Sequence, residues 1–349
     1  MPHSLAFVAW ANDVGGLCMR HLRVPGLCDL VTNYAREFLG ETLHVTPMAT
    51  GTDCLVAALC GDRMVTADGC QIYVCGAFDG SRRTLTGHTA RIFEISALGN
   101  LIASCSKDCT ARVWDSETGE CLQHLVHPDW VVDVIQLKHS EIATCCSDNY
   151  IRVWRGGQCL TRSLKSAVLL VPLASHKFIS CSFDDHLHMW DRVVSPHTPT
   201  YVDSGQVAVM HMVALDDGKF ATHDRQHIFV WDSHRRAFKI DCRATELCAL
   251  EQGLLAAGSP DGVVRVWDTR TAECLWTLAG HTAIIWSLTA MPDKKLASGS
   301  ADRTVRVWDL TTGTCVHVLS NPTSCVKGLV ALEHTLVSLG IDRTVCVWE

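Results

Sequence analysis

The chain has 349 residues, of which 48% are hydrophobic and 19% are charged, and its net charge is −7. This composition provides for a large buried core and lacks the basic balance that is typical of proteins that bind nucleic acid or anionic membranes. We therefore expect partners other than nucleic acid or a membrane.

The chain contains 19 cysteines, a number that could indicate disulfides or zinc. The closest pairs, Cys70 with Cys75 and Cys105 with Cys109, lack the second pair that zinc sites use. A thiol within a short strand-like run behaves as a small buried apolar group, and such runs contain Cys105, Cys145, Cys146, Cys181 and Cys248. We predict buried free thiols, no metal, no cofactor and a reducing compartment, the cytoplasm or alternatively the nucleus.

Residues 1–39 differ from the rest of the chain. Their apolar start is too short for a membrane span and lacks the basic lead of a signal peptide. Residues 17–39 have apolar side chains near helical spacing, interrupted at Val24-Pro25-Gly26, which predicts two helices. We interpret residues 1–39 as a helical cap on the main domain. The segment also resembles the helical tail of adaptor domains of the BTB or F-box kind.

From residue 40 to 349, one phrase recurs every 36 to 41 residues and ends in Trp, usually followed by Asp. A degenerate first copy, RMVTADGCQIYVCG, has Cys75 in the Trp position. The Trp position is then filled by Trp114, Trp154, Trp190, Trp231, Trp267, Trp308 and Trp348. Each unit contains four short β signals separated by turn residues, which predicts one four-stranded sheet per unit. We count eight units. Seven is the alternative if the degenerate first copy packs differently.

The phrases GHTARIF at Gly87–Phe93 and GHTAIIW at Gly280–Trp286, together with the Trp-Asp endings, resemble the WD-repeat (WD40) family over roughly residues 41–349. The resemblance implies an all-β fold, an eight-bladed or alternatively seven-bladed β-propeller of four-stranded antiparallel blades. The last unit ends after its third strand. Because GETLHV at Gly40–Val45 matches an outer strand of another unit, we predict that residues 41–46 close the ring of a domain spanning 40–349.

The resemblance also implies a buried hydrogen-bonded tetrad in the best units, formed by His88, Ser104, Asp108 and Trp114 and by His281, Ser298, Asp302 and Trp308. The same side chains could be taken for a nucleophilic triad. Catalytic sites do not recur every 40 residues, so we interpret the sets as structural. The remaining support for an enzyme is two histidine pairs, 186 with 188 and 223 with 227, which we assign to turns. No phosphate-loop, metalloprotease or hydrolase motif is present, and we predict no enzymatic activity and no catalytic residues.

Function is therefore expected on the faces of the ring, as a scaffold or adaptor for other proteins or peptide motifs. Loops that enter the innermost strands frame the top face and carry anchor-type side chains. By register these are Arg91, Phe93, Trp130, Val132, Arg243, Thr245, Ile284 and Trp286. The alternative is that Phe93, Val132, Ile284 and Trp286 are partly buried between blades.

A second surface is indicated by residues 255–270. They resemble the box by which some WD-repeat proteins dock onto the adaptor of a cullin-type ubiquitin ligase, and its informative residues are Trp267, Asp268 and Arg270. The resemblance implies that the protein is a substrate receptor of such a ligase. A scaffold subunit of a signalling or ribonucleoprotein assembly is the alternative, and an enzyme built on a propeller is the least favoured one.

Overall fold

A computed structural model describes residues 43–44, 54–60, 63–76, 82–137, 140–164, 167, 169–173, 177–182, 186–193, 200–202, 209–224, 226–232, 235–320, 322, 324–331, 336–342 and 345–348. These residues form eight four-stranded antiparallel sheets. Apart from two short 3₁₀ turns, η2 (Asp216–Gly218) and η3 (Glu251–Gly253), the described residues are strands and their connections. The predicted helices within residues 1–39 lie outside the described residues and stay a prediction.

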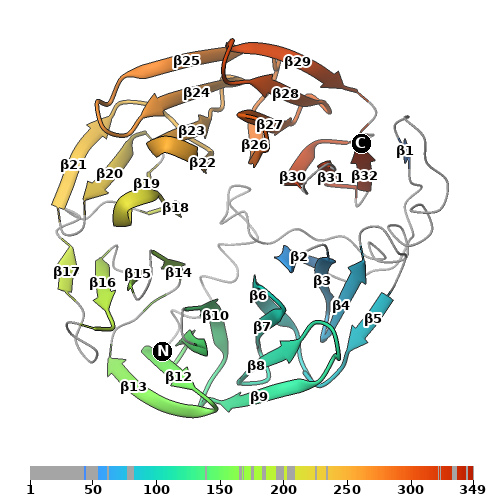
Figure 1. The fold of residues 1–349 in the computed structure, drawn as a ribbon, viewed down its shortest axis with the longest axis vertical. Coiled ribbons are helices and arrows are strands. Elements are labelled where there is room, and N and C mark those ends of the chain that lie inside the picture. The colour runs from blue at the N-terminus through green and yellow to red at the C-terminus, as the bar shows by residue number, and fades with distance from the viewer. Residues whose placement is uncertain are drawn as a thin grey trace.

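The eight sheets lie around a ring (Figure 1), and we number them as blades in chain order. Blade 1 contains β2 (Cys54–Cys60), β3 (Arg63–Asp68), β4 (Gln71–Gly76) and β5 (Arg82–Leu85), and blade 2 contains β6 (Ile92–Leu98), β7 (Leu101–Ser106), β8 (Thr110–Asp115) and β9 (Cys121–Val126). Blade 3 contains β10 (Val131–Gln136), β11 (Glu141–Cys146), β12 (Tyr150–Arg155) and β13 (Gln158–Leu164). Blade 4 contains β14 (Leu169–Pro172), β15 (Lys177–Cys181), β16 (Leu187–Asp191) and β17 (Thr200–Val202).

Blade 5 contains β18 (His211–Ala214), β19 (Lys219–His223), β20 (Ile228–Asp232) and β21 (Arg235–Ile240). Blade 6 contains β22 (Glu246–Leu250), β23 (Leu254–Gly258), β24 (Val263–Asp268) and β25 (Cys274–Ala279). Blade 7 contains β26 (Ile285–Met291), β27 (Lys295–Ser300), β28 (Val305–Asp309) and β29 (Thr314–Leu319). In each of blades 1 to 7 the first strand lies nearest the centre of the ring and the fourth lies outermost (Figure 1).

Blade 8 combines the two ends of the sequence. It contains β30 (Val326–Ala331), β31 (Leu336–Gly340) and β32 (Val345–Trp348), and its fourth strand is β1 (Leu43–His44). Leu43 pairs with Val347 and His44 with Cys346. These two residues are the described part of the segment 41–46 to which the sequence assigns ring closure.

The repeated Trp fills the space between neighbouring blades. Trp114 of blade 2 packs into a cluster made largely of blade 1 side chains, and Trp308 of blade 7 packs in the same way against blade 6. Both side chains are fully buried. An indole of this size removes about 200 Å² from water, which at about 25 cal/mol per Å² contributes about 5 kcal/mol of hydrophobic stabilisation. In blades 2 to 8, the recurring Trp is therefore the main apolar link to the preceding blade.

The cysteines follow the same packing. The described ones are free thiols, and Cys105, Cys145, Cys146 and Cys181 are buried within inner blade strands as expected. Cys248, which the sequence also places among the buried thiols, is only half-buried. In the described part of the chain, no group of three or more His, Cys, Asp or Glu side chains is arranged to hold a metal ion. Among the same residues, no helix has the length and apolar character needed to cross a bilayer.

Candidate protein-binding face

Two blades contain a complete hydrogen-bonded tetrad. In blade 2 the two ring nitrogens of His88 lie 2.8 Å from Asp108 Oδ2 and 2.8 Å from Ser104 Oγ. Ser104 Oγ also accepts a hydrogen bond from Trp114 Nε1 at 2.9 Å. The equivalent contacts in blade 7 are each 2.8 Å long and join His281, Ser298, Asp302 and Trp308.

The chemistry of the tetrads indicates a structural role and not a catalytic one. Burial lowers the pKa of His88 and of His281, although the neighbouring carboxylate raises it in each case. A neutral imidazole can donate from Nδ1 to the carboxylate and accept the serine proton at Nε2. Ser104 and Ser298 are fully buried, so neither hydroxyl is accessible to a substrate. The repeated Asp and His therefore hold a turn and a loop together.

Other blades keep only part of the set. In blade 3, His127 contacts Thr144 Oγ1 at 2.9 Å, but its second ring nitrogen lies 3.1 Å from the Leu125 carbonyl oxygen. Asp148, in the position of Asp302, instead forms an ion pair with Arg152. Of the histidines that the sequence assigns to turns, His188 and His223 lie in strands and are buried.

The predicted binding residues lie at the end of the ring where the innermost strands begin, which we call the top face. Phe93 and Trp130 come from neighbouring blades, with ring centroids 6.3 Å apart and both side chains half-buried. Lys107, from the turn between β7 and β8, places its Nζ 4.4 Å from the centre of a Trp130 ring. The sequence predicted the two aromatic residues and missed the lysine. We call these three residues the Trp130 cluster.

A second aromatic–cation pair lies on blades 7 and 8. Lys327 Nζ is 5.8 Å from the centre of a Trp286 ring, within the range of a cation–π contact. Phe93, Val132, Trp286 and Lys327 all sit where the pairing of the first strand with the second shifts register. A β-bulge leaves one residue unpaired and redirects its side chain. The repeated bulge thus gives the top face its variable side chains.

The other predicted top-face residues differ in their surroundings. The hydroxyl of Thr245 donates to the backbone oxygens of Gly258 and Ile285, so it joins blades 6 and 7. Val132 is half-buried against the core between blades 3 and 4, and Ile284 is also half-buried. Arg91 is half-buried as well, whereas Arg243 is exposed. The alternative of partial burial therefore describes Phe93, Val132, Ile284 and Trp286 correctly. Trp130 is half-buried to the same class, and of the predicted set only Arg243 is exposed.

The proposed adaptor box lies at the opposite end of the ring, because the third strand of each blade runs away from the top face. Trp267 is buried, and the Asp268 side chain is 13% exposed. Arg270 donates to both Asp268 carboxylate oxygens, at 2.9 and 2.6 Å, which lowers the pKa of Asp268 to about 2. The Arg270 side chain is 64% exposed, so it is the accessible member of the box.

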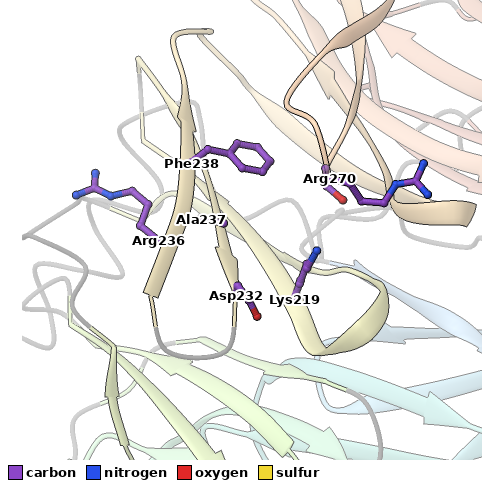
Figure 2. Close-up of a pocket in the computed structure, with 7 residues that line it drawn as sticks. Lys219, Asp232, Arg236, Ala237, Phe238 and Arg270 are labelled. Carbon is purple, nitrogen blue, oxygen red and sulfur yellow. The ribbon is translucent and has the colours of Figure 1, made fainter.

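Arg270 also borders a pocket of about 370 Å³ between blades 5 and 6, with Lys219, Asp232, Phe238 and Thr269 among its lining residues. Figure 2 shows that the guanidinium groups of Arg236 and Arg270 point away from each other on either side of this pocket. The Arg236 guanidinium lies over the rings of Phe229 and Trp231. The pocket therefore lies between two blades, and its two arginines are directed away from a common centre.

A ring of four-stranded antiparallel sheets, with the first strand of each at the centre, is a β-propeller. The model of the WD domain, G-beta repeat, matches residues 79–115, 119–155 and 272–309. The chain thus contains WD40 repeats in three places, as the sequence predicted, and its relatives include WD repeat-containing proteins.

Similar proteins include several with WD-repeat names. The chain is 24% identical over 213 residues to WD repeat-containing protein pop1 of Schizosaccharomyces pombe, covering 61% of this chain and 25% of that protein. It is 29% identical over 149 residues to the ribosome biogenesis protein WDR12 homolog of Ixodes scapularis, covering 39% and 35%. Nuclear distribution protein PAC1 of Fusarium vanettenii is 30% identical over 238 residues, covering 62% and 50%. The chain thus spans a quarter to a half of these three relatives.

Among solved structures, the computationally designed Ika8 protein has a TM-score of 0.71 and 25% sequence identity, covering 84% of this chain and 95% of the designed one. Proteins built on WD repeats are interaction scaffolds, and this chain shares that architecture.

Proposed function

We propose that this protein is a non-enzymatic scaffold subunit of a multiprotein assembly and that it binds a partner protein or peptide on its top face. The observation that carries the proposal is the pair of aromatic–lysine contacts at bulged or loop positions of that face, Trp130 with Lys107 and Trp286 with Lys327. Tryptophan is among the residue types that dominate binding energies at protein interfaces. The names of the relatives, which include ribosome biogenesis and nuclear distribution proteins, support an assembly role.

The test compares the partners of two folded variants. In the top-face variant, Phe93, Trp130, Arg243 and Trp286 are replaced by alanine. The matched control replaces exposed apolar residues of outer strands, Leu122 and Val318, which are 47% and 51% exposed. Quantitative affinity mass spectrometry should show at least a tenfold loss of specific partners for the top-face variant and none for the control. If the top-face variant folds and retains every partner, the proposal is wrong.

A second candidate function is substrate receptor of a cullin-type ubiquitin ligase, favoured by the exposed Arg270 guanidinium beside the Asp268 carboxylate. Arg270→Ala should abolish capture of cullin-ligase subunits and leave top-face partners in place. Arg236→Ala, which removes a cation on the other side of the same pocket, is the matched control. Absence of ligase subunits from the parent's partners, or their unchanged capture by Arg270→Ala, would eliminate this function.

We place the protein in the cytoplasm or the nucleus, where free thiols persist.

A further inference from the structure

Blade 6 has lost the hydroxyl that other blades use to hold their Trp. In six blades the indole N–H donates to a serine or threonine hydroxyl at 2.8 to 2.9 Å, and the donors are Trp114, Trp154, Trp190, Trp231, Trp308 and Trp348. In blade 6, Ala257 occupies the position of Ser298, because Ala257 pairs with Arg265 as Ser298 pairs with Arg306. Trp267 is 4% exposed, and its N–H makes no hydrogen bond to any residue that the structure describes.

The top face is hollowed at the same place. A groove of about 460 Å³ lies between the segment that follows β21 and the turn between β23 and β24, and Trp267 is part of its lining. Its polar lining residues include Cys242, Arg243, Ser259, Asp261 and Arg265. Complete tetrads place a histidine in the loop that enters the first strand. In blade 6 that loop supplies no such histidine, so we attribute the groove to the incomplete tetrad.

Most charges in the groove are compensated. Arg265 Nη2 lies 2.9 Å from Asp261 Oδ2, and Arg265 Nη1 donates to Ser259 Oγ at 3.1 Å. Asp241 is paired with Lys239 at 3.1 Å and lies 3.7 Å from a ring nitrogen of His227. Arg243 is exposed, and within the described part of the chain its side chain makes no ion pair or hydrogen bond. Among the described residues, the groove therefore contains one uncompensated cation, Arg243, and one indole N–H, that of Trp267, without an acceptor.

We propose that this groove binds an anionic oxygen group, a carboxylate or a phosphate, carried by an extended segment of the partner protein. Arg243 supplies the positive charge, and Trp267 Nε1 supplies a donor to which no described residue offers an acceptor. A hydrogen bond to an ionised acceptor is about twice as strong as a neutral one. The groove opens on the face that holds the Trp130 cluster, so the proposal rests on the proposed function and specifies the chemistry of one subsite of that face.

The test follows the indole N–H resonance of Trp267 in protein labelled with ¹⁵N-tryptophan, during titration with inorganic phosphate or acetate at constant ionic strength. We expect a saturable shift of this resonance, assigned through its loss in Trp267→Phe. Arg243→Gln should weaken the affinity at least fivefold, whereas Arg303→Gln, which changes an exposed arginine of the blade 7 turn, should leave it unchanged. Saturation by phosphate alone assigns a phosphorylated side chain, and comparable saturation by acetate assigns Asp or Glu.

A second variant tests the part played by the missing hydroxyl. Ala257→Ser returns an acceptor to Trp267 Nε1, so it should weaken anion binding at least threefold and raise the melting temperature. The proposal is overturned if the Trp267 resonance responds to neither anion, or if Arg243→Gln and Ala257→Ser both bind as the parent does. Failure of the proposed function is distinguishable, because the parent protein would then still bind the anion although the top-face variant, which lacks Arg243, kept all its partners.

Discussion

At the scale of single residues, the same aspartate has two kinds of partner. Asp302 lies 2.8 Å from a ring nitrogen of His281, whereas Asp261, in the same position of blade 6, pairs with Arg265 four residues later. Asp148 of blade 3 likewise pairs with an arginine four residues later, Arg152, although His127 is present in the loop of that blade. The position of the aspartate was predictable from its spacing to Trp. Its partner was not, because the choice depends on the path of a loop that the repeat pattern does not specify.

The first prediction concerns pH and His127. Burial, with a smaller effect of the nearby Arg152 charge, lowers the pKa of this imidazole to about 4. In the unfolded chain a histidine titrates near about 6.5. Between these two values the unfolded state binds more protons, so the stabilising contribution is complete above about pH 6.5 and is lost as the pH falls towards 4. A shift of this size corresponds to about 3 kcal/mol.

Urea denaturation at a series of pH values between 7 and 4 measures this effect. The free energy of unfolding of the parent should decrease with falling pH more steeply than that of His127→Gln, which cannot titrate. His317→Gln is the matched control, since His317 is exposed, and it should keep the steep profile of the parent. Parallel profiles for the parent and His127→Gln would contradict the assignment.

At the scale of strands, the residue after the tetrad hydroxyl contacts the next blade. This residue is Cys105 in blade 2, Cys145 in blade 3 and Cys181 in blade 4. The same position is Gly258 in blade 6, where alanine replaces the hydroxyl residue, and Gly299 in blade 7. A Cβ added to Gly299 would lie 2.5 Å from a methyl carbon of Val326 in blade 8. In blades 6 and 7 the inner strand of the following blade thus leaves little room for a side chain at this position.

The second prediction follows from this contact. Gly299→Ala should reduce the free energy of unfolding by about 2 kcal/mol, because overpacking forces the two blades apart. Val326→Ala removes the methyl groups that the new Cβ would meet, so the double variant should be less destabilised than the sum of the two single variants. Chemical denaturation of the four proteins measures the coupling. Additive effects would show that the alanine is accommodated in some other way.

The sequence predicts the arrangement of strands within a blade but not the side-chain contacts between blades. Strand order, turns and the inner position of the first strand were predictable, because each unit repeats them within about 40 residues and one alternation of apolar side chains. The lysines of the top face were not. Lys107 comes from a turn of blade 2 and reaches Trp130 in blade 3, while Lys327 reaches Trp286 of the preceding blade. Contacts between blades depend on the geometry of the ring, for which a single unit carries no signal.

At the scale of the whole molecule, the antiparallel order of strands separates two surfaces. The Trp130 cluster and the blade 6 groove lie where first strands begin, whereas Arg270 follows the end of a third strand and lies at the other end. One rigid ring can therefore present its top face to one protein and its opposite end to another at the same time. This separation is why the tests of Trp130 and Arg270 are expected to give independent results.

The third prediction concerns closure of the ring. Only β1 covers the edge of β32 in blade 8, through the pairs of Leu43 with Val347 and His44 with Cys346. An uncovered strand presents unpaired backbone groups to other chains. A protein that begins at residue 47 should therefore melt at a lower temperature than one that begins at residue 40, and light scattering after size exclusion should show a larger mass. The shorter deletion is the control because it retains residues 41–46. Equal melting temperatures and masses for the two proteins would mean that blade 8 is stable without its borrowed strand.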